Sequence, residues 1–143
     1  MDEVKYLYTD HDYIPVPRYA VGQVVFVISS FGKRDHIDKK LIRVVNRPRW
    51  LEGNEFCQSH WVVDYRYQDI MGDKPWGRMH TEYTLREENI YSTEEEATIA
   101  LAQRFIEDTR RAAAQLASQF KRLGIPMNAS MLQLSAPENQ KQE

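Results

Sequence analysis

STEEEATIALAQRFIEDTRRAAAQLASQFKRLGIP, residues 92–126, is the stretch that decides the fold class. Thr93 can cap a helix N-terminus, and Glu96 follows three residues later, which is the spacing of a capping box. The glutamates at 94–96 suit the positive end of a helix dipole, and no helix breaker follows before Gly124 and Pro126. The stretch therefore predicts one long amphipathic helix over residues 93–123.

The apolar side chains of this helix recur at alternating intervals of four and three residues, which is typical of a coiled-coil seam. The seam consists of Ala102, Ile106, Thr109, Ala113, Leu116, Phe120 and Leu123. Ala97, Leu101 and Phe105 widen the stripe in the first turns, as expected for a helix that docks on a sheet. Two interpretations stay open, since the whole helix could pack on its own domain or its last turns could pair with a second copy.

The length of the helix favours the second interpretation. A helix of this span is about 45 Å long, whereas a β-body of this size has a diameter of about 25–30 Å. The body would therefore leave Leu116, Phe120 and Leu123 in water, and we expect these three residues to mediate a homodimer. Tail residues after Gly124 could instead fold back over the stripe.

Short β-branched or alternating runs precede the helix and predict a β-rich body over residues 19–91. The predicted strands cover 23–28, 41–45, 60–67, 78–85 and 89–91, with polar loops at 29–40 and 47–55. The turn residues at 72–75 suggest that 60–67 and 78–85 form an antiparallel hairpin. A register with Asp64 opposite Arg78 and His60 opposite Glu82 avoids the like-charge pair of Arg66 with Arg78.

The first of these strands follows Tyr19-Ala20-Val21-Gly22-Gln23-Val24-Val25-Phe26, which resembles the opening strand of SH3-like barrels. The helix entry at Glu95-Glu96-Ala97 is similar to that of small phage and bacterial accessory proteins. The fold class that we predict is α+β: a small antiparallel bent sheet or SH3-like barrel, followed by one long C-terminal amphipathic helix. We expect a single domain over residues 1–134 and a disordered tail over 135–143.

Composition narrows the function classes. The chain has 143 residues, a formal net charge of −2 and one cysteine, Cys57, which excludes an intrachain disulfide and fits a reducing compartment. No apolar stretch approaches the roughly 18 residues of a membrane span, and Met1-Asp2-Glu3 does not begin a signal peptide. We therefore expect a cytoplasmic protein that does not associate with membranes.

Catalytic and metal-binding patterns are weak. Cys57 and His60 have the spacing of half a zinc site, and His80 could approach from a neighbouring strand, but His11 and His36 stand alone. Cys57 with a histidine and Asp64 could also make a thiolate pair, although no positive niche surrounds the cysteine. The consecutive acids Glu87-Glu88 read as solvated surface. We predict no catalytic residue, no metal and no cofactor, while a small-ligand site around His60, Asp64 and His80 stays as a third class.

Basic and aromatic residues gather in the middle third of the chain. Between residues 39 and 86 there are nine Lys or Arg and six Asp or Glu, so this segment carries +3. We expect one partner-binding edge formed by two loop tips, with the residues Arg47, Arg49, Trp50, Lys74, Trp76 and Arg78. The prediction is a non-enzymatic binding module, a phage or bacterial accessory protein that engages another protein. The alternative is a nucleic-acid-binding SH3-like barrel that uses Arg47, Arg49, Trp50, Trp76 and Arg78.

Overall fold

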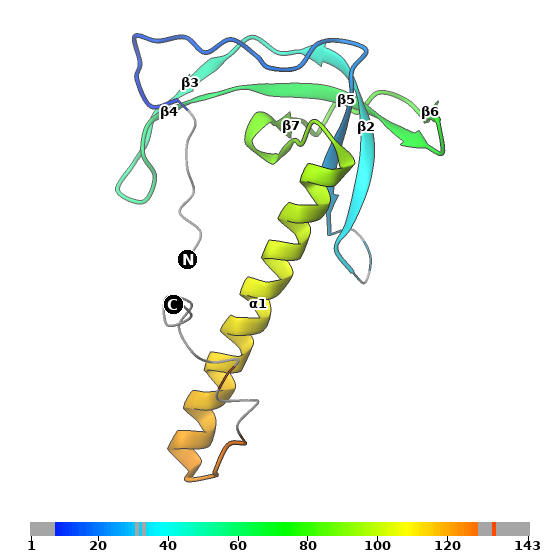
Figure 1. The fold of residues 1–143 in the computed structure, drawn as a ribbon. Coiled ribbons are helices and arrows are strands. Elements are labelled where there is room, and N and C mark those ends of the chain that lie inside the picture. Colours follow the sequence, from blue (N-terminus) through cyan, green and yellow to red (C-terminus); the bar gives the residue numbers. More distant parts are fainter. Residues whose placement is uncertain (1–7, 31, 33, 129–132, 134–143) are drawn as a thin grey trace, which may run out of the picture. The chain divides into compact units, whose positions relative to one another are not determined.

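The computed structural model describes residues 8–30, 32, 34–128 and 133, and it contains two antiparallel sheets and one long helix (Figure 1). This confirms the predicted α+β class. Contacts between Cα atoms group the chain into two compact units, Met1–Thr98 and Ile99–Glu143. The single domain over residues 1–134 stays a prediction, and the tail at 135–143 lies outside the described residues.

The larger sheet has the strand order β1-β2-β5-β6. Its strands are β1 (Val24–Ser29), β2 (His36–Val45), β5 (Asp64–Met71) and β6 (Lys74–Trp76), and β7 (Leu85–Arg86) also pairs with β5. A second sheet pairs β3 (Arg49–Leu51) with β4 (His60–Val62). Neighbouring strands are antiparallel throughout, and Val63 alone separates β4 from β5 (Figure 1).

The larger sheet is not closed into a barrel. In the part of the chain that the structure describes, β1 and β6 are the outer strands, and β1 meets the chain beyond β7 at one residue pair, Phe26 with Tyr91. The backbones of these two residues exchange hydrogen bonds of 2.9 and 2.8 Å. The bent sheet is therefore the correct alternative of the two that the sequence left open.

Several strand boundaries differ from the prediction. β2 begins at His36, inside the predicted loop, because charged side chains at 36, 38 and 40 hide the alternation of its first half. β3 lies inside the predicted loop at 47–55, and the predicted strand at 60–67 breaks at Val63. In place of a strand at 89–91, the 3-10 helix η1 (Glu87–Asn89) is followed by the single bridge at Tyr91.

The predicted hairpin register is wrong. Residues 78–84 form no strand; Asp64 pairs with Arg86, and His60 pairs with Leu51. A two-residue turn at Gly72-Asp73 sets the register instead, because it places Met71 opposite Lys74. The left-handed φ of 66° at Gly72 is the conformation that such a turn requires. Turn geometry, and not cross-strand charge, thus determines where β6 lies.

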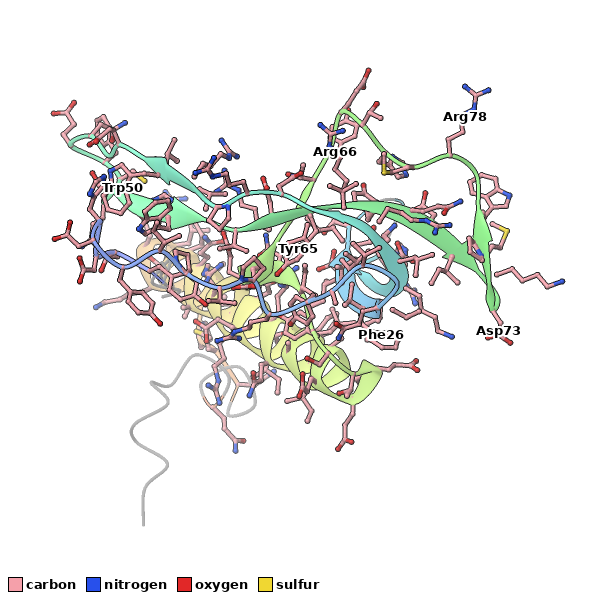
Figure 2. All side chains as sticks on the ribbon, turned by 90° about the horizontal axis from the view of Figure 1, so that it is seen from above. Phe26, Trp50, Tyr65, Arg66, Asp73 and Arg78 are labelled. Carbon is pink, nitrogen blue, oxygen red and sulfur yellow. The ribbon has the colours of Figure 1, made fainter. Side chains whose placement is uncertain are left out.

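The core of the first unit lies on one face of the larger sheet. Val25, Ile42 and Tyr65 are fully buried, and Tyr19, Val27, Val63 and Ile90 complete the cluster. The Tyr19 ring meets the Tyr65 ring edge-on at 5.7 Å, and its hydroxyl donates to the carbonyl of Ile90 at 3.2 Å. Tyr65 lies at the centre of the sheet in Figure 2.

The helix α1 (Glu94–Leu123) has the predicted ends. The Thr93 hydroxyl accepts from the backbone N–H of Glu96 at 3.1 Å, and the Glu96 carboxylate accepts from the N–H of Ser92 at 3.2 Å. At the C-terminus Gly124 has a φ of 71°, and the N–H of Ile125 donates to the carbonyl of Phe120 at 2.9 Å. The conformation of Gly124 and the Ile125 hydrogen bond belong to a Schellman motif at the C-terminus. Local signals therefore set both ends of the helix.

Candidate functional site

A single row of paired residues positions the candidate site. Val25 pairs with Lys40, Lys40 with Asp69, and Asp69 with Trp76, so the row crosses four strands. Cross-strand partners project from the same face of a sheet. Lys40, Asp69 and Trp76 therefore share the face that carries Val25 and the core, but lie beyond the apolar cluster. The inner face of the sheet changes from apolar to polar along this row.

A groove of about 810 Å³ lies over this polar end. Its lining includes His36, Asp38, Lys40, Tyr67, Asp69, Met71, Trp76, His80 and Tyr83. A smaller cavity of about 320 Å³ shares Asp69, Trp76, His80 and Tyr83 and continues along the 77–83 segment. The volume is of the size that holds a drug-sized molecule or a few side chains of a peptide.

Asp69 is the centre of the polar contacts in the groove. One carboxylate oxygen accepts from the Lys40 ammonium at 2.5 Å, and the other lies 2.7 Å from Nε2 of His80. The His80 ring stacks on the Tyr67 ring at 4.6 Å, and the Lys40 ammonium lies 5.3 Å from the centre of the Tyr67 ring. These four residues contact one another and form the floor of the groove.

The pKa values of this floor reflect burial and charge together. Burial raises the pKa of Asp69, but hydrogen bonds and charge from His80 and Lys40 outweigh it, so the net shift is downward. Burial also raises the pKa of Tyr67, which the nearby ammonium of Lys40 opposes only in part. At neutral pH the floor therefore holds an ionised Asp69 beside a neutral Tyr67 hydroxyl.

Three large side chains surround the groove in contact with solvent. Trp76 is 57% exposed, Met71 is 64% exposed and Tyr83 is 66% exposed. Tryptophan and methionine are enriched at protein interfaces, and an apolar cluster of this kind marks a contact surface. An apolar rim around a polar floor is a composition typical of recognition sites.

The charges around the groove cancel. Lys39, Lys40 and Arg78 face Asp38, Asp69 and Glu82 across the linings of the two cavities, which gives three positive and three negative side chains. A surface that binds nucleic acid needs a net positive field along its length. The electrostatics of this groove therefore suit a partner without high charge density.

The predicted partner-binding residues do not form one edge. Trp50 pairs with Trp61 in the middle of β4, whereas Lys74 pairs with Met71 at the end of β5. Ten residues of extended chain separate these positions, or about 33 Å at 3.3 Å per residue. Figure 2 shows Trp50, in the second sheet, far from Asp73 and Arg78 at the opposite end of the larger sheet. Of the six, Trp76 lines the groove and the smaller cavity, and Arg78 lines the smaller cavity.

Of the predicted residues at 47–50, Arg49 and Trp50 contact other residues of the protein. Arg49 lies 3.4 Å from the buried carboxylate of Asp64, and Arg47 is exposed. The Trp50 ring meets the rings of His11 and Trp61 edge-on at 4.7 and 5.6 Å. Trp50 is thus half-buried in an aromatic cluster, which gives it a packing role in the second sheet.

The residues of the third function class are spread apart. His80 contacts Asp69, Asp64 accepts from Asn46 at 3.0 Å and from Thr84 at 3.2 Å, and His60 contacts the carbonyl of Gln58 at 2.9 Å. Cys57 lies near the carbonyl of Gln58 in the loop before β4. Within 8–30, 32, 34–128 and 133, no three His, Cys, Asp or Glu side chains are grouped as metal ligands.

A His–Asp pair can orient an imidazole for proton transfer when a nucleophile lies beside it. His80 contacts Asp69 and the Tyr67 ring, and its backbone N–H donates to the Tyr67 carbonyl at 2.9 Å. These contacts hold the imidazole in the floor of the groove.

Sequence reasoning missed Lys40, Tyr67, Asp69 and Tyr83. Lys40 fell within the predicted loop at 29–40, Tyr67 was the last residue of the predicted strand at 60–67, and Asp69 lay between that strand and the predicted turn at 72–75. The available signal was the alternation of 65, 67 and 69, which carries the core face onward from Tyr65. This alternation can be interpreted only when the partner strand is known.

The predicted dimer residues lie on α1. Leu116 and Leu123 are 55% and 58% exposed, and Phe120 is half-buried. Among the described residues of the helix, Ala97 is the buried one. No helix in the described part of the chain has the length and apolar character needed to cross a membrane.

Comparisons of the chain with protein-family models, with curated proteins and with solved structures found no match.

Proposed function

We propose that this protein is a non-enzymatic binding module that holds a peptide segment of a protein partner in the groove over Asp69. The observation that carries the proposal is the ring of exposed Met71, Trp76 and Tyr83 around a groove of about 810 Å³. Aromatic side chains at a rim supply contact area at low entropic cost. A phage or bacterial accessory role, acting in the cytoplasm, remains part of this proposal.

The floor suits a binding role. The Asp69 carboxylate is paired with the Lys40 ammonium at 2.5 Å and with Nε2 of His80 at 2.7 Å. Polar groups held in this way can orient the polar backbone of a peptide. The preferred ligand has apolar or aromatic side chains for the rim and little net charge.

Nucleic acid is the second candidate, because Lys74, Trp76 and Arg78 lie together at this end of the sheet and Lys74 and Arg78 are exposed. The balance of three positive and three negative residues around the groove disfavours it. Salt distinguishes the two ligands. Phosphate contacts weaken steeply as salt rises, whereas apolar peptide contacts do not.

Peptide selection tests the proposal directly. A random peptide display library is panned against the full chain, and the enriched peptides are measured by calorimetry. We expect Trp76→Ala and Tyr83→Ala each to weaken binding by about tenfold or more, as is common for interface aromatics. Phe56→Ala is the matched control, because Phe56 is 89% exposed and outside the groove lining.

Two results would contradict the proposal. One is a set of selected peptides whose affinity the groove variants leave unchanged. The other is a failure to enrich any peptide, together with tight oligonucleotide binding that is lost in moderate salt. Neither Trp76 nor Tyr83 belongs to the core, so we expect both variants to fold. Circular dichroism checks the folded state of each variant.

A further inference from the structure

The charged residues of α1 avoid one stripe of the helix. In a heptad that runs from Ile99 to Leu123, the a positions are Ile99, Ile106, Ala113 and Phe120, and the d positions are Ala102, Thr109, Leu116 and Leu123. The charged residues of this span are Arg104, Glu107, Asp108, Arg110, Arg111, Lys121 and Arg122. All but Arg110 occupy the outer b, c and f positions, which point away from a seam.

Six of the eight seam side chains are exposed, and Ala113 and Phe120 are half-buried. Ile99, Ile106, Leu116 and Leu123 are each more than half exposed, between 52% and 58%. The polar residue among them, Thr109, donates its hydroxyl to the Phe105 carbonyl of its own helix at 2.8 Å. Its hydrogen bond is therefore already made, and the residue can be buried without a further partner.

We infer that α1 pairs with α1 of a second copy in an antiparallel two-helix coil. An antiparallel register centred on Arg111 places a positions against d positions throughout. It brings Ile99 to Leu123, Ala102 to Phe120, Ile106 to Leu116 and Thr109 to Ala113 of the second copy. Each contact occurs twice about a two-fold axis, so the interface is closed and self-complementary.

Side-chain size selects this orientation. In the antiparallel register Ala102, one of the two alanines of the seam, faces the largest seam residue, Phe120. A parallel pair would stack Phe120 on Phe120 and Ala102 on Ala102, which gives one overfilled layer and one hollow layer. Alternation of large and small side chains across facing positions is what fills a core evenly.

Arg110 is the one charged residue that borders the seam, and it meets the Arg110 of the second copy near the axis. Both side chains are at the border with solvent, where like charges cost little. Outside the seam, Arg111 lies 3.9 Å from Glu107 and 3.6 Å from Asp108, so the outer face has its own ion pairs. The helix thus separates an apolar inner face from a charged outer face.

Light scattering and sedimentation of the full chain test the association. We expect a dimer that dissociates on dilution. The double variant Leu116→Glu with Phe120→Glu should weaken dimerisation by about 100-fold or more, because it places unpaired charges in the seam. The matched control, Gln115→Glu with Ser118→Glu, adds the same charge at c and f positions and should stay dimeric. A wild type that is monomeric at high micromolar concentration would overturn the inference.

Disulfide trapping tests the orientation. In a Cys57→Ser background, proteins with Thr109→Cys and Ala113→Cys are oxidised separately and as a mixture. The antiparallel register predicts efficient cross-linking in the mixture alone, because residue 109 of one helix is displaced about 6 Å along the axis from its own copy. Cross-linking of each variant with itself would show a parallel pair and overturn the register. Circular dichroism confirms that each variant keeps its helix.

Discussion

Glu87 connects distant segments of the fold, and its neighbours in sequence do not predict this role. The sequence reads Glu87-Glu88 as solvated surface, yet Glu87 is only 3% exposed. Its Oε1 accepts from the Tyr65 hydroxyl at 2.7 Å and from the backbone N–H of Arg18 at 2.7 Å, and its Oε2 accepts from the Tyr8 hydroxyl at 3.3 Å. The carboxylate thereby joins the N-terminal segment to the centre of the sheet.

We predict that Glu87→Ala lowers the free energy of unfolding by about 2–4 kcal/mol, since each buried donor left without an acceptor costs about 1–3 kcal/mol. Urea unfolding followed by tryptophan fluorescence measures the change. Glu88→Ala is the matched control, because Glu88 is exposed and should alter stability by less than about 0.5 kcal/mol. Equal effects of the two substitutions would show that the contacts of Glu87 do not matter for stability.

At the scale of the element, α1 is the part of the molecule that local signals determine most completely. Its first turn has the Thr93 and Glu96 cap, and its last turn has basic residues at 121 and 122 before Gly124. The strands behave differently. β6 has only three residues, all exposed, and it is in place because the turn before it returns the chain to β5. Helix ends depend on neighbours in sequence, whereas short strands depend on neighbours in space.

The cap gives a prediction for the helix. Thr93→Ala removes the acceptor for the N–H of Glu96, and we expect a loss of about 1 kcal/mol in the free energy of unfolding. Thr93→Ser keeps an acceptor oxygen at the same place and should retain most of the stability. Thermal unfolding followed by helical circular dichroism compares the three proteins. A serine variant as unstable as the alanine variant would rule out the hydroxyl as the cause.

At the scale of the whole molecule, buried tyrosines make stability depend on alkaline pH. Burial, and then hydrogen bonding to Glu87, raises the pKa of Tyr65 well above its usual value, and burial is also the main cause that raises the pKa of Tyr8 and Tyr67. In the unfolded chain these groups lose their protons near pH 10, while the folded state keeps them. The stability that they contribute is therefore complete below about pH 10 and is lost as the pH rises above it.

For Tyr65, which is fully buried, this linkage should lower the free energy of unfolding by about 1.4 kcal/mol per pH unit above pH 10. We predict that Tyr65→Phe reduces this slope by about the contribution of one proton, in addition to a constant loss at neutral pH from the missing hydrogen bond. Urea midpoints measured between pH 8 and about pH 11 separate the two effects. A variant with the same slope as the wild type would show that Tyr65 ionises freely in the folded state.

The sequence by itself determined the α+β class, both ends of α1, the β1 strand and the seam of the helix. Each of these rests on residues close together in the chain, namely the cap at 93–96, the glycine at 124 and the β-branched run at 24–28. Tertiary structure alone decided that the sheet is open, that β2 begins at His36 and that Glu87 is buried.

The groove belongs to this second group. Lys40, Asp69 and Trp76 come from three different strands, and they meet because the two-residue turn at Gly72-Asp73 and the pairing of β2 with β5 bring them into one row. A shift of one residue in either pairing would move every side chain of a strand to the other face. Charge patterns in one strand are too weak to specify such a register, because turn geometry and core packing contribute more free energy than one cross-strand pair.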